Sequence, residues 1–120
     1  TWSLAPRLPQ ATLLSIHRDE ERASAWAAER DRLLAMLHKR RRIFNDAILS
    51  SGIPLMPSDD GYFAYIPCDL AQEVAERAAE DFLYVIPMSD GVRIGLCSIP
   101  DDDVERAAEV LINAWRAVTG

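Results

Sequence analysis

The sequence predicts an α+β fold, in which a small, mostly antiparallel or mixed sheet is covered by helices and one long N-terminal helix bridges two bodies of structure. Apolar residues recur at helical intervals over residues 19–50, and again in shorter segments after residues 69 and 101. Short aromatic and β-branched runs lie between these segments and are bounded by turn residues. A chain of 120 residues is long enough for one domain with a substantial core. The order α(α)–β–α–β–β–α favours helices layered on one small sheet.

The composition is that of an ordinary globular protein, with 49% hydrophobic and 27% charged residues. The net charge of -6 argues against nucleic acid as a main partner, and no apolar run is long enough to span a membrane. No signal-peptide pattern is present, and Cys68 and Cys97 lack the spacing of a zinc site or a disulfide framework. We therefore expect a reduced, cytoplasmic protein without a metal. The apolar start at Thr1 and Trp2, without methionine, predicts a piece of a longer protein.

The N-terminal part predicts an extended lead-in over residues 1–8 and a short helix over residues 9–17, with a proline in its first turn. Asp19 is a suitable N-cap for the long helix that follows, and Gly52 and Pro54 mark its end. The predicted apolar stripe of this helix consists of Trp26, Leu33, Leu37, Phe44 and Ile48. A helix of this length predicts a connection between two parts of the structure.

The remaining elements are shorter. In chain order we predict an edge strand at 55–56, a turn at 59–61, a strand at 62–66, a helix from Asp69 with Gln72 as its capping-box partner, a strand at 82–86, a turn at 89–91, a strand at 91–98, and a helix capped by residues 101–103. The predicted buried positions are Leu70, Val74 and Ala78 on the first of these helices, and Val104, Ala107, Ala108, Leu111, Ile112 and Trp115 on the second.

Arg93 is the residue of greatest chemical interest, because it interrupts the otherwise apolar strand GVRIGLCS. Alternation places Val92, Ile94 and Leu96 on one face, and Arg93 with Gly95 and Cys97 on the other. A guanidinium offers a rigid fork of donors that matches a carboxylate, and a glycine on the same face leaves room for a ligand. A surface or salt-bridged arginine is the alternative, and the residue types alone favour it.

Other polar groups predict no chemistry. His17 and His38 have no ligands at metal spacing and are expected on helix surfaces. The basic residues 38–42 are expected to form a solvated helix face with i,i+4 ion pairs. The acidic residues 101–103 are expected to cap a helix, since they lack the alternating ligands of a calcium loop. The chain has neither a nucleophile-elbow serine nor a glycine-rich phosphate loop.

The ordered motifs WSLAP, a long helix with ERDRLLAML and KRRRIF, DGYF, and GVRIGLC resemble the C-terminal part of a fold-type-I, pyridoxal-phosphate-dependent aminotransferase. The nearest subgroup is the aspartate/aromatic amino acid aminotransferases, and the resemblance covers essentially the whole chain. It implies that residues 1–18 are a lead-in packed on a large domain, and that residues 19–120 form the small domain.

The resemblance also implies a function. Arg93 stands at the position of the arginine that binds the α-carboxylate of the amino acid, and Phe63 and Tyr62 stand in the element that brings an aromatic residue to the active-site mouth. Trp2 and Ser3 resemble a segment near the dimer interface. The Schiff-base lysine and the other residues that bind pyridoxal 5′-phosphate precede this region in the family. The chain alone is thus expected to hold no catalytic or cofactor-binding residue, to bind no cofactor and to be inactive.

Further expectations concern partners. An amino acid and a 2-oxo acid are the expected substrates, without nucleic acid or membrane. Apolar residues in the lead-in predict a homodimer or higher oligomer; they are Trp2, Leu4, Leu8, Leu13 and Leu14. Two alternatives remain at this point. One is a stand-alone α+β module that binds a small carboxylate or regulates another protein, and the other is an interaction domain in which the long helix pairs with a partner.

Overall fold

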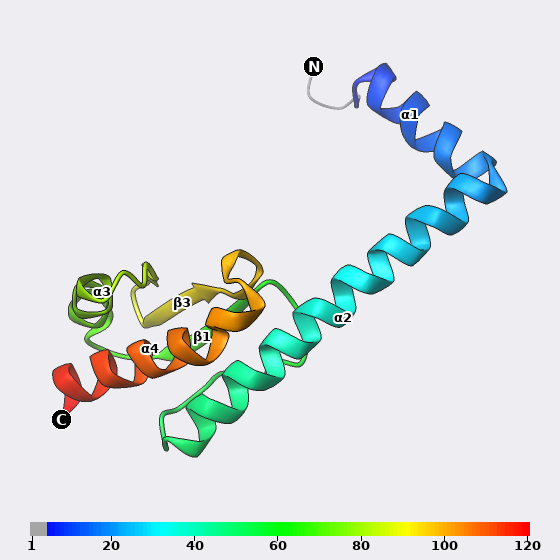
Figure 1. The fold of residues 1–120 in the computed structure, drawn as a ribbon. Coiled ribbons are helices and arrows are strands. Elements are labelled where there is room, and N and C mark those ends of the chain that lie inside the picture. The colour runs from blue at the N-terminus through cyan, green and yellow to red at the C-terminus, as the bar shows by residue number, and fades with distance from the viewer. Residues whose placement is uncertain (1–4) are drawn as a thin grey trace. The chain divides into compact units, whose positions relative to one another are not determined.

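The computed structural model describes residues 5–120 and confirms the predicted α+β class with one long helix. Its elements are α1 (Arg7–Arg18), α2 (Glu20–Ser50), β1 (Phe63–Pro67), α3 (Ala71–Glu80), β2 (Ile86–Pro87), β3 (Gly91–Gly95), two short 3₁₀ turns (Leu96–Ser98 and Asp101–Asp103) and α4 (Val104–Thr119), shown in Figure 1. Residues 1–4 of the predicted extended lead-in over residues 1–8 lie outside the described residues, and the prediction is wrong for its last two residues, because α1 already begins at Arg7.

The chain divides into two compact units, Thr1–Ala35 and Met36–Gly120, and α2 contributes residues to both. In the first unit α1 has no buried residue. The Trp26 ring meets the His17 ring edge-on at 5.5 Å, and the Arg30 guanidinium lies 5.4 Å from the centre of the same ring. The predicted domain boundary after residue 18 stays a prediction.

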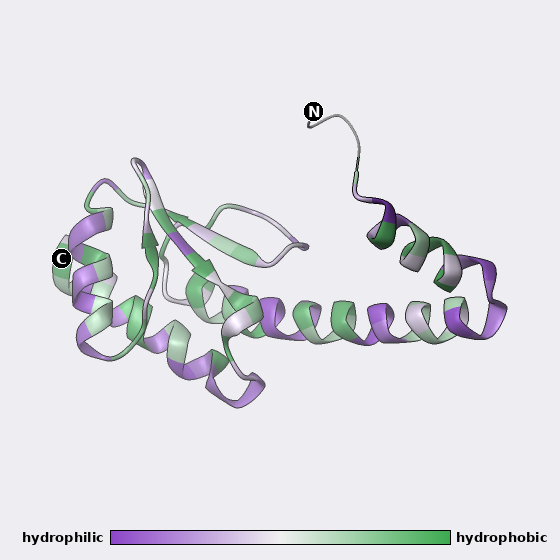
Figure 2. Ribbon diagram, turned by 90° about the horizontal axis from the view of Figure 1, so that it is seen from above, coloured by the Kyte–Doolittle hydropathy of each residue, from purple (hydrophilic) through white to green (hydrophobic). Residues whose placement is uncertain are grey.

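Helix α2 begins and ends where the sequence predicts. The Asp19 carboxylate accepts a hydrogen bond from the Arg22 backbone N–H at 3.0 Å, as an N-cap does. Gly52 has a φ of +81°, a left-handed conformation that suits glycine after a helix. Hydrophobic and hydrophilic bands alternate along α2 (Figure 2), yet the predicted stripe is buried only from Leu37 onwards, since Trp26 and Leu33 are 41% and 58% exposed.

The second unit is built on an antiparallel sheet with the strand order β1-β3-β2. Its inner face packs against α2, α3 and α4. The core consists of Ala64, Ile66, Val92 and Ile94 from the sheet, Phe44 and Ile48 from α2, Val74 and Ala78 from α3, and Val104, Ala108 and Leu111 from α4. The outer face carries Phe63 and Ile86, which remain 46% and 45% exposed. The sheet therefore has one packed face and one open face.

The predicted strand at 82–86 is wrong for most of its length, because β2 contains only Ile86 and Pro87. Residues 82 and 83 instead terminate α3. The Phe82 N–H donates to the Ala79 carbonyl at 3.0 Å, and the Leu83 N–H donates to the Ala78 carbonyl at 3.1 Å. This is the hydrogen-bond pattern of a Schellman motif, and Phe82 has the required positive φ of 64°. A helix end thus replaces the expected strand start.

The predicted side-chain caps of α3 and α4 are also wrong. Neither Leu70 nor Asp103, the residues before these helices, makes a side-chain capping bond. Gln72 bonds to the Glu76 carboxylate at 2.9 Å within α3, and Leu70 is 40% exposed rather than buried. The remaining predicted buried positions of both helices are confirmed, although Ile112 and Trp115 are only half-buried.

Two strand boundaries differ from the prediction. Residues 55–56 form no strand, although the Met56 N–H donates to the Tyr65 carbonyl at 2.9 Å. Strand β3 ends at Gly95, and the chain then tightens into the 3₁₀ turn Leu96–Ser98. Leu96 is still fully buried and Cys97 is exposed. The turn therefore keeps the inward and outward positions that the alternation predicts without continuing the strand.

Candidate functional site

Arg93 lies at the centre of β3, which is the middle strand of the sheet, and its side chain belongs to the outer face. Its backbone pairs with Tyr65 of β1 on one side and with Ile86 of β2 on the other. The guanidinium carbon lies 4.5 Å from the centre of the Phe63 ring. Pairing on both sides fixes the strand, and the cation–π contact fixes the side chain. The arginine is therefore held in place before any ligand arrives.

Glycines at both ends of β3 make room for two aromatic rings beside Arg93. A Cβ atom at Gly91 would lie 2.5 Å from Cζ and Oη of Tyr65, and one at Gly95 would lie 3.5 Å from Cε1 of Phe63. The two rings, which come from β1, thus lie across β3 on either side of the arginine. At Gly91 the contact is too close for any larger residue, since a Cβ would also lie 2.6 Å from the Ile66 carbonyl oxygen.

The Arg93 guanidinium has unused hydrogen-bonding capacity. Its Nε atom is buried and has no hydrogen-bond partner within residues 5–120. None of the ion pairs formed within this part of the chain involves Arg93. A buried donor without a partner is unfavourable, so an acceptor that reaches it gains affinity from satisfying it.

Tyr65, which pairs with Arg93 across the sheet, bonds to the carboxylate of Asp90. Tyr65 Oη donates a hydrogen bond to the Asp90 carboxylate, and this bond, with a smaller contribution from burial, raises the pKa of Tyr65 to about 12. Asp90 is thus bonded to the phenol, and no ion pair joins it to Arg93 within residues 5–120. Sequence reasoning did not identify Tyr65 or Asp90. Their pairing depends on the antiparallel register of β1 and β3, which places Tyr65 opposite Arg93 and which the sequence pattern does not show.

Of the two aromatic residues predicted for the site, the structure brings Phe63 against Arg93. Tyr62 is 60% exposed, and its backbone carbonyl accepts a bond from the Leu96 N–H at 2.8 Å. The predicted roles of Trp2 and Ser3 concern residues outside the described part of the chain.

The predicted solvated face at residues 38–42 is wrong for two of its arginines, because Arg40 and Arg41 are only 9% and 2% exposed. Arg41 donates to the carbonyls of Ser58, Gly61 and Phe63 at 3.3, 3.1 and 2.6 Å. Burial lowers its pKa, and the nearby charges of two aspartates, at positions 60 and 59, oppose this shift. The physical reason for the error is that backbone carbonyls, which a charge pattern cannot reveal, solvate the buried guanidinium.

Arg40 binds the turn that follows β3. It donates to Asp101 at 2.5 Å and to the carbonyls of Leu96 and Cys97 at 3.2 and 3.1 Å. The hydrogen bond from Arg40 holds the pKa of Asp101 below its usual value. Asp101 therefore pairs with a buried guanidinium instead of capping α4. His38 lies on the helix surface as predicted, with its side chain 51% exposed, and its Nε2 lies 2.5 Å from an oxygen of the Asp60 carboxylate.

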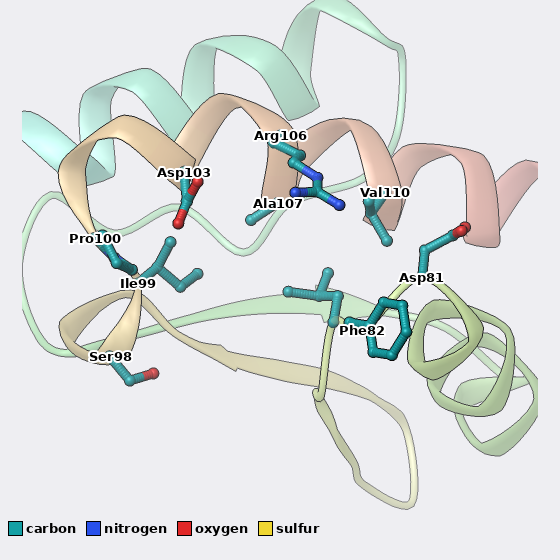
Figure 3. A pocket seen from close by; sticks show the side chains of 10 residues that line it. Asp81, Phe82, Ser98, Ile99, Pro100, Asp103, Arg106, Ala107 and Val110 are labelled. Atoms are coloured by element: carbon teal, nitrogen blue, oxygen red, sulfur yellow. The ribbon is translucent and has the colours of Figure 1, made fainter.

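A pocket of about 220 Å³ lies elsewhere on the second unit, between α4 and the chain segments that follow α3 and β3 (Figure 3). Phe82, Ile99 and Val110 give it apolar walls. Asp103, from the 3₁₀ turn before α4, and Arg106 of α4 also line it. Arg93 is not among its lining residues. This pocket is therefore not part of the Arg93 site.

Comparison with known proteins identifies the family. The family model described as aminotransferase class I and II matches residues 2–111, so the chain belongs to this family. Eight solved chains match, and one of them is an aminotransferase from Anaerococcus prevotii, with a TM-score of 0.77 and 21% sequence identity. That match covers 82% of this chain and 24% of the other, so this chain spans about a quarter of the length of that aminotransferase. No curated protein matches the chain.

The family generally uses pyridoxal phosphate, but the described residues do not fit this cofactor. The sequence contains a single lysine, Lys39, whose side chain is 60% exposed and whose Nζ lies 3.9 Å from Asp101. A solvated ammonium in a surface ion pair is not the buried amine that Schiff-base chemistry needs. Within residues 5–120 no cluster of potential metal ligands is present, and no helix is long and apolar enough to cross a membrane.

Proposed function

We propose that the chain is the C-terminal small domain of a pyridoxal-phosphate-dependent aminotransferase of the aspartate/aromatic subgroup. The whole enzyme would transfer an amino group between an amino acid and a 2-oxo acid, and Arg93 would bind the substrate α-carboxylate. The observation that supports this role is the unpaired guanidinium of Arg93 on an open sheet face, held between Phe63 and Tyr65.

The geometry suits a carboxylate. Phe63 covers one face of the planar guanidinium, so the donor N–H groups, which lie in the plane, remain available at its edge. A carboxylate accepts two parallel bonds from such an edge, and these bonds fix both its position and its orientation. A phosphate could also accept them, but the family membership makes an amino-acid carboxylate the better match.

Binding the carboxylate would contribute to catalysis by positioning. The cofactor, when bound, supplies the electron sink for reactions at the substrate α-carbon. Arg93 would hold the amino acid by its carboxylate so that the α-carbon meets the cofactor in a fixed geometry. The cofactor site would come from other parts of the enzyme, because Lys39 does not fit it. We accordingly propose that the isolated chain is inactive.

We further propose that the chain self-associates when it is isolated. Helix α1 exposes Leu8, Leu13 and Leu14, at 77%, 53% and 49%, and such apolar surface favours association. Sedimentation of the 120-residue chain should show a dimer or a larger species, and Leu13→Gln with Leu14→Gln should shift it towards monomer. A monomer at high concentration in the unsubstituted chain would contradict this proposal. The whole enzyme is proposed to be a cytoplasmic homodimer.

The experiment that tests the function uses the full-length protein that contains this chain. Its absorption spectrum is recorded with pyridoxal phosphate, before and after the addition of each of a set of amino acids. A cofactor band that shifts with an amino acid, and shifts back with a 2-oxo acid, would support the proposal. A protein that gives no cofactor band would overturn it and favour a module that binds a carboxylate without catalysis.

A further inference from the structure

Two adjacent arginines of α2 contact the two chain segments that carry the Arg93 site. Arg41 and Arg40 come from consecutive positions, so their side chains leave the helix about 100° apart. Arg41 binds carbonyls of the segment 58–63, which leads into β1. Arg40 binds carbonyls of the turn Leu96–Ser98, which directly follows β3. One helical turn of α2 thus contacts the start of one site strand and the end of its neighbour.

The contact of Arg41 is the more direct of the two. Its Nη2 donates to the Phe63 carbonyl at 2.6 Å, and the ring of the same residue lies against the Arg93 guanidinium at 4.5 Å. Gly61, whose carbonyl Arg41 also binds, has a φ of +96° and turns the chain into β1. Arg41 therefore fixes the backbone on which the Phe63 side chain turns.

Neighbouring residues of α2 support this arrangement. His38, three positions before Arg41, contacts Asp60, and Asn45, four positions after it, donates to the Ser58 carbonyl at 3.4 Å. Positions 38, 41 and 45 lie on one face of a helix. The next residue, Arg42, is exposed, and its side chain forms no hydrogen bond or ion pair among the described residues. Arg41 therefore differs from the adjacent Arg42 in both burial and hydrogen bonding, although the two residues are of the same type.

We propose that Arg41, assisted by Arg40, is a positioning residue for carboxylate binding: it holds Phe63 so that the Arg93 guanidinium faces the substrate with its donor edge. Neither residue touches the substrate in this proposal, which rests on the proposed function of Arg93. Without Arg41, the segment 58–63 loses three hydrogen bonds and the Phe63 ring loses its fixed position. The selectivity of the site for carboxylates then falls.

The test compares two substrates of the full-length enzyme, namely the amino acid that reacts fastest in the spectral screen and the amine that lacks only its α-carboxylate. The ratio of their kcat/KM values measures carboxylate recognition. Arg41→Gln should lower this ratio between about 10- and 100-fold, mainly through the KM of the amino acid, with the amine little affected. Arg41→Lys, which keeps the charge and part of the bonding, should restore part of the ratio. Arg42→Gln, the matched control, should leave it unchanged.

The outcomes are distinguishable. If Arg41→Gln leaves the ratio unchanged, or lowers the reaction of both substrates equally, the positioning role is overturned. If Arg41→Gln does not fold, the same ratio is measured for Arg41→Lys: a ratio below that of the unsubstituted enzyme supports the positioning role, and an unchanged ratio overturns it. Arg93→Lys is measured in parallel: a ratio that does not change in this variant overturns the proposed function itself. A ratio that falls for Arg93→Lys and holds for both Arg41 variants overturns the positioning role alone.

Discussion

The buried arginines of α2 and the arginine of β3 are the same residue type in opposite bonding states. Arg40 and Arg41 are almost fully buried, and their guanidinium groups are bonded to backbone carbonyls and to Asp101. Arg93 is half-buried, rests on an aromatic ring, and has a buried Nε without a partner. The first two donate hydrogen bonds within the fold, whereas the side chain of Arg93 donates none within residues 5–120.

The bonding state of an arginine thus indicates better than its residue type whether the side chain stabilises the fold. A guanidinium that is bonded to its own chain contributes to stability, and its loss leaves acceptors unpaired. A guanidinium with a buried, unpaired donor instead lowers stability, because that donor has lost its bonds to water. Replacing Arg41 should therefore lower the free energy of unfolding, whereas replacing Arg93 should leave it unchanged or raise it.

The largest expected effect on stability comes from Arg41→Met in the full-length protein. Three carbonyls lose a charged donor, and the loss should lower the free energy of unfolding by about 2–4 kcal/mol. Arg93→Met should change it by less than about 0.5 kcal/mol or raise it, because no hydrogen bond or ion pair is lost and removal of the buried, unpartnered Nε offsets the loss of the cation–π contact with Phe63. Urea unfolding monitored by tryptophan fluorescence gives both values, with exposed Arg42→Met as the control. Equal losses for Arg41 and Arg93 would contradict the comparison.

A smaller effect is expected at the glycines beside Arg93. Gly91→Ala places a Cβ within 2.6 Å of both the Tyr65 ring and the Ile66 carbonyl, so it should destabilise the protein by about 1–3 kcal/mol. Gly95→Ala, whose closest contact is 3.4 Å from Ser98 Oγ, should cost less than about 1 kcal/mol. The same unfolding measurement checks both. If the two alanines behave alike, the ring of Tyr65 does not lie across Gly91 as described.

The smallest expected effect is the titration of Tyr65. Its bond to Asp90 raises the pKa to about 12, so the folded protein keeps this proton at a pH where the unfolded chain, near its ordinary value of 10.0, has released it. The pair therefore stabilises the fold below about pH 10, and this contribution is lost as the pH rises towards 12. Ultraviolet absorbance of tyrosinate should show a late component that Tyr65→Phe removes and Asp90→Asn shifts to lower pH. If the late component persists in Tyr65→Phe, it belongs to another tyrosine, and the hydrogen bond between Tyr65 and Asp90 does not raise the pKa as described.

The sequence predicts the parts of this fold that depend on periodic burial and on glycine. Asp19 and Gly52 mark the ends of α2 because a capping carboxylate and a left-handed turn are local requirements. The position of Arg93 on the open face of the sheet was also predictable, because successive side chains of a strand point to opposite faces.

Features that depend on distant partners were not predictable. Arg40 and Arg41 belong to a basic run that is typical of a solvated face, and only the folded chain brings carbonyls of residues 58–63 and 96–97 to them. Asp101 leaves its capping role because a buried guanidinium is a stronger partner. Phe82 takes a left-handed helix end that local propensity assigns to glycine.

The candidate site was predicted in part. Arg93 and Phe63 were named from the motif order, and the structure places them in contact. Tyr65 and Asp90 were missed, since their pairing requires the antiparallel register of β1 and β3 and the space above Gly91.

The most direct test of the central claim is Arg93→Lys in the full-length enzyme, assayed with an amino acid and with the amine that lacks its α-carboxylate. Lysine keeps the positive charge and loses the two-pronged donor edge. The account predicts that kcat/KM for the amino acid falls about 10- to 100-fold while that for the amine stays within about twofold. A fall of the same size for both substrates, or for neither, would contradict the assignment of Arg93 as the group that binds the carboxylate.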